Sequence, residues 1–581
     1  MVSALPASRR GSLALALFFA AACGPERAEE PADLVLVNGS VITLDDETPS
    51  AQGLAVQDGR IVAVGSSRDM RAWVGNGTEV VDLAGRVAVP GLIEGHGHFL
   101  GLGQSKMILD LTTTTSFQDI VDMVAEAAAE AEPGEWITGR GWHQEKWTST
   151  PEPNVDGVPF HDALSAVSPD NPVALTHASG HASFVNARAL EAAGIDGTTR
   201  DPDGGTIVRG PDGRATGLLR ETASGLVGRA MAQAEAGRSP EEREAEFRRM
   251  VELAGEEALS KGITSFHDAG TSFASIDGYR ALADEGALPV RLYVMVRTSN
   301  EDLEANLDDY RMEGYGGGFL TFRAIKRSID GALGSHGAWL LEPYTDLPSS
   351  SGLNTAPVED VEETARIAAR HGFQLNVHAI GDRGNREVLD LYQRAWEETG
   401  EDGSELRWRV EHAQHLHPDD IGRFAEMGVI AAMQGVHATS DGPWVPEKLG
   451  EWRSETGAYM WRDLWDSGAI VSNGTDVPVE DIDPLASYYS TVSRMTNTGE
   501  RFYPDQALTR EEALRSYTLN NAYASFQEEE LGSLSVGKLA DITVLDRNIL
   551  EVPEEEIPRT RVEMTIVDGE IRFTRSDISG G

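Results

Sequence analysis

The sequence predicts an α/β protein built on a (β/α)8 barrel (TIM barrel), with a small β-sandwich made from both chain ends and an insertion domain after barrel strand 1. Eight short apolar runs occupy the middle of the chain, and most precede a helical pattern, as a parallel barrel requires. The two chain ends carry similar short strands, and one long gap separates the first two runs. At 581 residues the chain exceeds a single hydrophobic core, so a barrel with attached pieces is expected.

The N-terminus has the features of a processing signal. Arg9 and Arg10 precede a short apolar run that cannot span a bilayer, and Cys23 follows as the only cysteine of the chain. Ala-Ala-Ala-Cys at this point resembles the lipobox of bacterial lipoproteins, in which the cysteine is lipidated and becomes the first residue. An ordinary secretory signal, cleaved near an Ala-x-Ala site, is the alternative. Both alternatives predict an exported protein with a signal peptide at 1–22 and a spacer at 23–33.

The lipobox resemblance predicts a protein attached to the bacterial cell envelope by a lipid on Cys23 and by no other membrane contact. Because no second cysteine is present, disulfides and thiolate metal sites are excluded. The formal charge of -45, from 49 Lys+Arg against 94 Asp+Glu, would repel the phosphates of nucleic acids. A nucleic acid partner is therefore not expected. The expected partner is a small-molecule substrate.

Both chain ends predict short antiparallel strands. Residues 34–90 contain apolar segments separated by Asn-Gly, Asp-Gly and Ala-Gly turns. Residues 529–577 contain two further segments, with an Asp-Gly hairpin at Asp568 and Gly569. We expect the two regions to form one β-sandwich that is split by the rest of the chain.

The barrel is predicted over residues 91–104, which hold the first strand, and residues 231–528, which hold the others. Residues 105–230 are too long for a connection within a βα unit and are interpreted as a substrate-covering domain. Since the carboxyl ends of barrel strands form the active-site face, polar residues at these ends indicate catalysis. The eight runs are VAVPGLIEGHGH, GITSFHDAG, VRLYVMV, LTFRAIK, FQLNVHA, LRWRVEHAQ, GVIAAMQ and AIVSNGTD.

His96 and His98 form the strongest local signal, at the end of the first barrel strand. Two imidazoles at positions i and i+2 of an extended segment point to the same side, so both can reach one cation. A surface pair of histidines is the alternative. The position of the pair directly after the apolar strand favours a metal site.

Two more histidines and an aspartate follow other strands. His378 ends the fifth strand and His412 ends the sixth, and each alone could be an ordinary buried polar residue. Four histidines on one face need a shared reason, which a metal ion supplies. Asp476 follows the eighth strand; it is either a helix N-cap or a carboxylate that contacts the metal and accepts a proton.

Lys326 lies at the end of the fourth strand, in a sequence with only six lysines. Burial drives an amine toward its neutral form, and a neutral amine can react with carbon dioxide to give a carbamate, an anionic bidentate ligand. The alternative is an ion pair with a carboxylate such as Asp330.

The chain resembles the amidohydrolase superfamily, specifically amidohydrolase family 3, close to the N-substituted formamide deformylase-like enzymes. The matching segments are PGLIEGHGH, GRGWHQEKW, GITSFHDAG, IKRSIDGALGS, NVHAIGDRG, RVEHAQH, AAMQGVH, NGTDVPVEDIDP and LGSLSVGKLADITVLD. The resemblance covers nearly the whole mature chain and implies the barrel, the split sandwich and one or two divalent metal ions, usually zinc. It implies as ligands His96, His98, Lys326 as a carbamate (a carboxylated lysine), His378, His412 and Asp476, with Asp476 also the catalytic proton shuttle.

Some positions near the expected substrate depart from the family pattern. The family often has arginine where this chain has His336, and Gln-Pro where this chain has Gln434 and Gly435. These departures concern the substrate and not the metal site. Four residues resemble family positions that line the pocket, with ordinary packing or hydrogen bonding as the alternative: His181, Trp142, Gln434 and His437.

The predicted function is hydrolysis of a non-peptide C–N bond, of amide or formamide type, by water that a metal activates. Asp476 would take a proton from the nucleophile and return it to the leaving nitrogen. One alternative is the same metal barrel acting on an ester, a lactone or a phosphoester, because the pocket alone selects the bond. Another is an exported binding lipoprotein without turnover, which predicts an incomplete ligand set.

Overall fold

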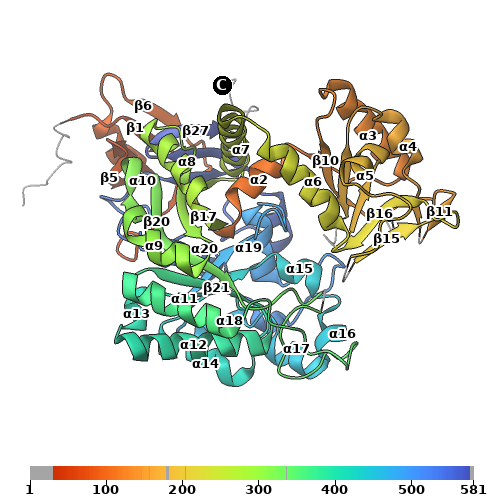
Figure 1. The fold of residues 1–581 in the computed structure, drawn as a ribbon. Helices are drawn as coiled ribbons and strands as arrows, with labels where there is room; N and C mark the ends of the chain where they lie inside the picture. The colour runs from red at the N-terminus through yellow and green to blue at the C-terminus, as the bar shows by residue number, and fades with distance from the viewer. Residues whose placement is uncertain are drawn as a thin grey trace, which may run out of the picture.

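The computed structural model describes residues 30–144, 147–155, 157–177, 182–202, 205–334 and 336–575. At its centre, eight parallel strands form a nearly closed barrel with helices outside it (Figure 1). All eight predicted runs are barrel strands, so the predicted barrel is confirmed. The strands are β8 (Leu92–Gly97), β17 (Ile263–Thr271), β18 (Arg291–Val296), β20 (Leu320–Ser328), β21 (Gln374–Ala379), β22 (Arg409–His412), β23 (Ile430–Gln434) and β24 (Val471–Gly474).

The first and last barrel strands meet at their carboxyl ends. The backbone N–H of Asp476 donates to the carbonyl of His96 at 2.7 Å, and the N–H of His98 donates to the carbonyl of Val477 at 2.8 Å. The loop after β24 therefore lies against the end of β8. Residues that are almost four hundred positions apart in the chain are fixed beside each other by backbone hydrogen bonds.

Helices cover the outside of the barrel, and most follow a strand directly. In α11 and α12 the buried residues repeat at helical spacing, so one face packs on the strands. Both helices end at a glycine in the left-handed conformation, Gly372 and Gly400. The main outer helices are α7 (Pro240–Ser260), α8 (Phe273–Asp284), α9 (Asn300–Tyr310), α11 (Val358–His371), α12 (Asp382–Thr399), α14 (Pro418–Met427), α19 (Pro484–Ser493), α20 (Arg510–Ser516) and α21 (Leu519–Ala524).

The barrel has two apolar regions. The larger core lies between the strands and the outer helices and includes Val296 and Ile325. A small cluster formed by Ala269, Tyr293, Met295 and Ala324 belongs to the opposite faces of the same strands, which point into the barrel. The interior above this cluster, toward the carboxyl ends, is polar, and the candidate site lies there.

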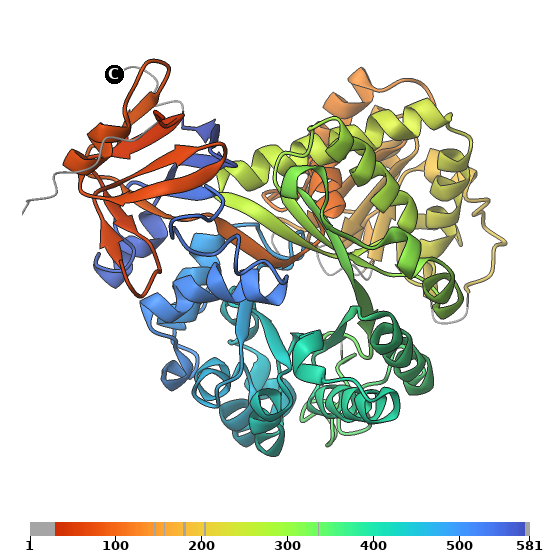
Figure 2. The same cartoon turned by 90° about the vertical axis from the view of Figure 1, so that its left-hand side faces the viewer.

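Strands from the two chain ends share one sheet, as Figure 2 shows for the red and blue segments. β7 (Val87–Pro90) pairs antiparallel with β25 (Ile542–Leu545), within the sheet order β27-β26-β25-β7-β2-β3. A second sheet, ordered β5-β4-β1-β6, packs on it through a shared apolar cluster. The other strands are β1 (Leu34–Val37), β2 (Ser40–Ile42), β3 (Ser50–Ala51), β4 (Gly53–Gln57), β5 (Arg60–Gly65), β6 (Glu79–Asp82), β26 (Val562–Val567) and β27 (Glu570–Thr574).

A buried ion pair joins the barrel to the sheet of the chain ends. Arg291 begins β18 and is only 1% exposed, and its guanidinium lies 2.9 Å from Asp541 and 3.0 Å from Asp568. Both aspartates flank strands of the C-terminal part. Breaking such a pair leaves a buried charge unpaired, which typically costs about 3–5 kcal/mol, so this contact fixes the two parts relative to each other.

The segment between β8 and β17 contains a sheet with its own apolar core, ordered β15-β16-β14-β13-β10-β9. Residues 104 and 230, the predicted boundaries, lie within helices α2 (Phe99–Ser105) and α6 (Ser224–Ala236). Its strands and helices are β9 (Leu109–Asp110), α3 (Phe117–Glu130), β10 (Ile137–Trp142), α4 (Asp162–Val167), β13 (Val173–His177), β14 (Ala182–Val185), α5 (Ala187–Ala192), β15 (Gly205–Arg209) and β16 (Ala215–Glu221).

No helix in the described part of the chain is long and apolar enough to cross a membrane. The predicted signal peptide and Cys23 lie outside the described residues.

Candidate metal centre

Three of the predicted ligands meet at the carboxyl ends of the barrel strands. His96 on β8, His412 on β22 and Asp476 after β24 each offer a ligand atom, and these atoms lie within 4.8 Å of one another. All three residues are buried. Imidazole nitrogens and a carboxylate oxygen at this spacing can coordinate one divalent cation.

His96 is held by a carboxylate from β22, a barrel strand that does not pair with β8. Its Nδ1 contacts Glu411, so Nε2 is directed to Asp476 Oδ1 and to Lys326 Nζ, both at 3.5 Å. Glu411 is itself paired with Arg409 at 2.7 Å, and both side chains are fully buried. Burial raises the pKa of Glu411, but the charges of Arg409, His96 and Lys326 hold it well below its usual range. Glu411 is therefore an anion that fixes the orientation of His96.

His412 is oriented in the same way by an amide. Its Nδ1 lies 2.6 Å from Gln434 Oε1, so Nδ1–H donates to that oxygen and Nε2 is left for a ligand. The His412 ring lies 4.9 Å from the His96 ring and 4.4 Å from the His378 ring. The backbone of His412 is left-handed, with φ 76°. Strained positions of this kind cluster at functional sites.

Asp476 is the carboxylate at the centre of the cluster. Its Oδ1 lies 3.2 Å from His98 Nε2, and its backbone is left-handed, with φ 58°. Burial raises the pKa of Asp476, but hydrogen bonds from His96 and His98 hold it well below its usual range. The alternative role as a helix N-cap is wrong, because Asp483 caps the following helix α19.

His98 and His378 complete the four histidines. The His98 side chain is 38% exposed, so the site opens to solvent on this side. His378 is more buried, and its Nε2 has no hydrogen-bond partner among the described residues, with Asp330 Oδ1 at 3.5 Å. Burial lowers the pKa of His378 to about 3, so its imidazole is neutral and able to coordinate a cation.

Lys326 faces the same centre and is 2% exposed. Burial lowers the pKa of its amine to about 8. The alternative ion pair with Asp330 does not form: that carboxylate accepts the N–H groups of Trp339, Ile380 and Gly381 instead. A lowered pKa increases the neutral fraction of the amine, which is the form that reacts with carbon dioxide.

The sequence prediction missed the carboxylates behind the histidines. Glu411 directly precedes His412, and Glu94 lies two residues before His96, where it accepts the N–H of Thr475 at 2.6 Å. Burial raises the pKa of Glu94 to about 8. A charged residue inside an apolar strand was the available signal, because such residues are rarely buried without a partner.

The four predicted pocket residues have different positions. Gln434 contacts His412, as described above, and His437 stacks on the same ring, with its Nε2 4.0 Å from Asp476. Trp142 instead lies in the core of the insertion segment, where its indole N–H donates to the carbonyl of Leu175. His181 lies outside the described residues.

The structure shows the contacts of the two residues that depart from the family pattern. His336 Nε2 lies 2.9 Å from Asp346 and 3.0 Å from Lys448 Nζ, in a polar group apart from the metal ligands. The N–H of Gly435 donates to Asn473 at 2.9 Å, a bond that a proline could not make. A Cβ at Gly435 would also lie only 2.3 Å from Thr491 Oγ1.

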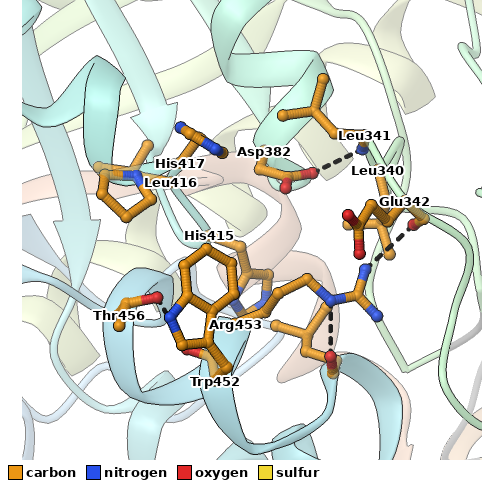
Figure 3. Close-up of a pocket in the computed structure, with 12 residues that line it drawn as sticks. Leu340, Leu341, Glu342, Asp382, His415, Leu416, His417, Trp452, Arg453 and Thr456 are labelled. Carbon is orange, nitrogen blue, oxygen red and sulfur yellow. Dashed lines mark hydrogen bonds between the residues drawn. The ribbon is translucent and has the colours of Figure 1, made fainter.

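A separate cavity of about 140 Å³ lies among the loops after β20, β21 and β22 and helix α17 (Glu451–Gly457), as Figure 3 shows. In the described structure, neither ring nitrogen of His415, one of its lining residues, has a hydrogen-bond partner. None of the candidate ligands lines this cavity. It is therefore not the place of the metal chemistry.

The chain is similar to known proteins over most of its length. The sequence profile described as amidohydrolase family matches residues 79–573. Protein LONG AFTER FAR-RED 3 of Arabidopsis thaliana is 33% identical over 530 residues, which are 89% of this chain and 88% of that protein. N-substituted formamide deformylase of Arthrobacter pascens is 29% identical over 557 residues, 94% of this chain and 99% of that enzyme.

A solved structure agrees with these relatives. The crystal structure of an uncharacterized metal-dependent hydrolase from Pyrococcus horikoshii superposes with a TM-score of 0.74 at 26% identity, over 90% of this chain and 99% of that one. The profile match, the shared barrel and the cluster of His96, His412 and Asp476 agree with one another. This chain belongs to the amidohydrolase family, and it is a hydrolase with a site for a divalent metal.

Proposed function

We propose that this protein hydrolyses a non-peptide C–N bond, of amide or formamide type, with a divalent metal as cofactor. The observation that carries the proposal is the meeting of His96, His412 and Asp476 ligand atoms within 4.8 Å at the catalytic face of the barrel. The similarity to N-substituted formamide deformylase over 94% of the chain supports the choice of the bond.

We assign six residues as ligands of one or two metal ions. Zinc is the metal that nitrogen and oxygen donors of this kind favour. Such an ion supplies two things to the reaction, an acidified water molecule and a polarised substrate carbonyl. The Lys326 amine would join the set after it adds to carbon dioxide and releases one proton, which gives an anionic carbamate. The ligands are His96, His98, Lys326, His378, His412 and Asp476.

Asp476 is assigned the proton transfer. It is ionised in the folded protein, and it lies beside His96 and His98. It would accept the proton of the nucleophile and return it to the leaving nitrogen. Glu411 and Gln434 would keep two imidazoles in the tautomers that present Nε2 to the metal.

We also propose that the enzyme is exported and anchored to a bacterial membrane by a lipid on Cys23. The order of an arginine pair, a short apolar run and a lone cysteine supports this proposal.

The bond type can be tested by initial rates on matched substrates. We expect turnover of formamides and other N-acyl amines to exceed that of lactones, esters and aryl phosphates. Chelator-treated protein should be inactive, and added zinc should restore the rate. If the highest rate is measured on a lactone, an ester or a phosphoester, the proposed C–N bond type is wrong and the same metal site acts on that other bond. No turnover of any substrate by metal-loaded protein would favour an exported binding lipoprotein instead.

Replacing Lys326 by alanine should lower both metal content and rate, because the variant cannot form the carbamate. Metal analysis and steady-state kinetics measure the two effects. Intact mass of the wild-type protein, recorded under native conditions, should include one added carbon dioxide that the variant lacks. Lys106→Ala, which removes a lysine paired with Glu257 on the surface, is the control and should change nothing. Full metal and full rate in Lys326→Ala would make this lysine a structural residue.

Asp476→Asn keeps the size and one oxygen of the side chain but removes the base. Most of the metal should remain, while kcat falls by about 10²–10⁴-fold or more. The acidic limb of the pH–rate profile should also change, since it reports the ionisation of the base. Asp483→Asn is the matched control, because asparagine also caps a helix well. A normal kcat with full metal in Asp476→Asn would exclude Asp476 from proton transfer.

The lipid anchor predicts that protein purified from a native membrane begins at Cys23 and carries acyl chains. Intact-mass analysis measures both features. Cys23→Ala should release the protein from the membrane fraction without a change in kcat. A product without acyl mass and cleaved at another residue would support an ordinary secretory signal.

A further inference from the structure

Arg297 is the first residue after strand β18, at the face of the barrel that holds the candidate metal centre. Its backbone N–H donates to the carbonyl of Thr271, which ends the neighbouring strand β17. Its side chain is exposed, and one guanidinium nitrogen donates to Ser328 Oγ at 2.6 Å. Ser328 in turn pairs in register with His378, a proposed metal ligand. The guanidinium is therefore held above the polar interior of the barrel.

Strand alternation places Arg297 and Lys326 on the same side. Met295 pairs with Ala324, and both belong to the small cluster inside the barrel. Side chains two residues further along a strand share the same face, so Arg297 and Lys326 both point inward. The surroundings of Gly270 confirm that Arg297 and Lys326 lie close together. A Cβ at Gly270 would lie 3.6 Å from Arg297 Nε and 3.6 Å from Lys326 Cγ.

No carboxylate of the described residues lies within the 4.0 Å ion-pair distance of Arg297, although the chain has 94 acidic side chains against 49 basic ones. The neighbouring Arg327 differs, because its nitrogens are bonded to Thr298, Asn300 and Thr364. Arg297 is thus a cation at the mouth of the site with no carboxylate side chain of these parts of the chain within ion-pair distance, and a carbamate on Lys326 would be the anion near it.

We propose that Arg297 binds a carboxylate of the substrate, so the substrate class is an N-formyl or N-acyl amine that carries a carboxylate near its scissile C–N bond. A guanidinium presents its N–H donors in a planar fork that matches a carboxylate. Ser328 holds one nitrogen in place and leaves others for the substrate. This inference rests on the proposed C–N hydrolysis and adds the substrate class to it.

Two substrates that differ only in this carboxylate provide the test: N-formylphenylalanine and N-formyl-2-phenylethylamine. The wild-type enzyme should have a kcat/KM at least about tenfold higher on the carboxylate, since a hydrogen bond to a charged group is worth this much. Arg297→Gln should remove the preference, mainly through KM, and Arg297→Lys should restore part of it. Arg370→Gln, which removes an exposed charge on α11, is the matched control. Metal content should stay unchanged in all variants.

Three results would overturn the inference. The first is equal kcat/KM on the two substrates in the wild-type enzyme, and the second is a preference that survives Arg297→Gln. The third is loss of metal and of the added carbon dioxide in Arg297→Gln, which would assign Arg297 to the support of Lys326 instead of the substrate.

If neither formamide is hydrolysed, the proposed bond type fails, and equilibrium binding decides the role of Arg297 alone. The probe is 3-phenylpropionate, titrated into the metal-loaded enzyme by calorimetry. Binding that is at least about tenfold weaker in Arg297→Gln than in wild type would support the carboxylate site. Unchanged binding, or no binding to the wild-type enzyme, would overturn it.

Discussion

The buried pair of Glu411 and Arg409 is the interaction on which the candidate site depends. Both side chains are fully buried inside the barrel, and Glu411 contacts Nδ1 of His96. A buried carboxylate is costly unless it is paired, and Arg409 provides the pair and also donates to the carbonyl of Gly95 at 2.7 Å. The same arginine therefore stabilises the anion and fixes the end of β8 beside it. Without this pair His96 would lose the contact that fixes its Nδ1.

The barrel fold positions the ligands by bringing the carboxyl ends of its strands together. His96, His412 and Asp476 come from the first, sixth and eighth strands. Their candidate ligand atoms nevertheless lie within 4.8 Å of one another. One backbone hydrogen bond from Asp476 to His96 and one from His98 to Val477 join the ends of the sheet at this point. The left-handed backbone at His412 and at Asp476 turns these side chains inward immediately after their strands.

Two residues outside the proposed ligand set, Gly435 and His336, depart from the family pattern. Gly435 makes a hydrogen bond that proline could not, and His336 joins a polar group with Asp346 and Lys448. Arg297 adds a cation beside Lys326. Because a hydrolytic metal site of this kind can act on several bonds, we propose that Arg297 helps to select the substrate. The fold and the metal site that this chain shares with its family therefore do not identify the substrate, and residues at the mouth of the barrel are proposed to do so.

The sequence alone determined the barrel, its eight strands and the residue types of a metal site, because apolar runs and polar strand ends follow directly from the burial that a parallel barrel imposes. It could not determine which residues support the ligands, since Glu411 and Gln434 act on histidines through contacts that no local pattern encodes. It also left open whether Asp476 caps a helix, whether Lys326 pairs with Asp330 and whether Trp142 lines the pocket. Only the tertiary structure decided these points, because each depends on which distant strands and loops are brought into contact.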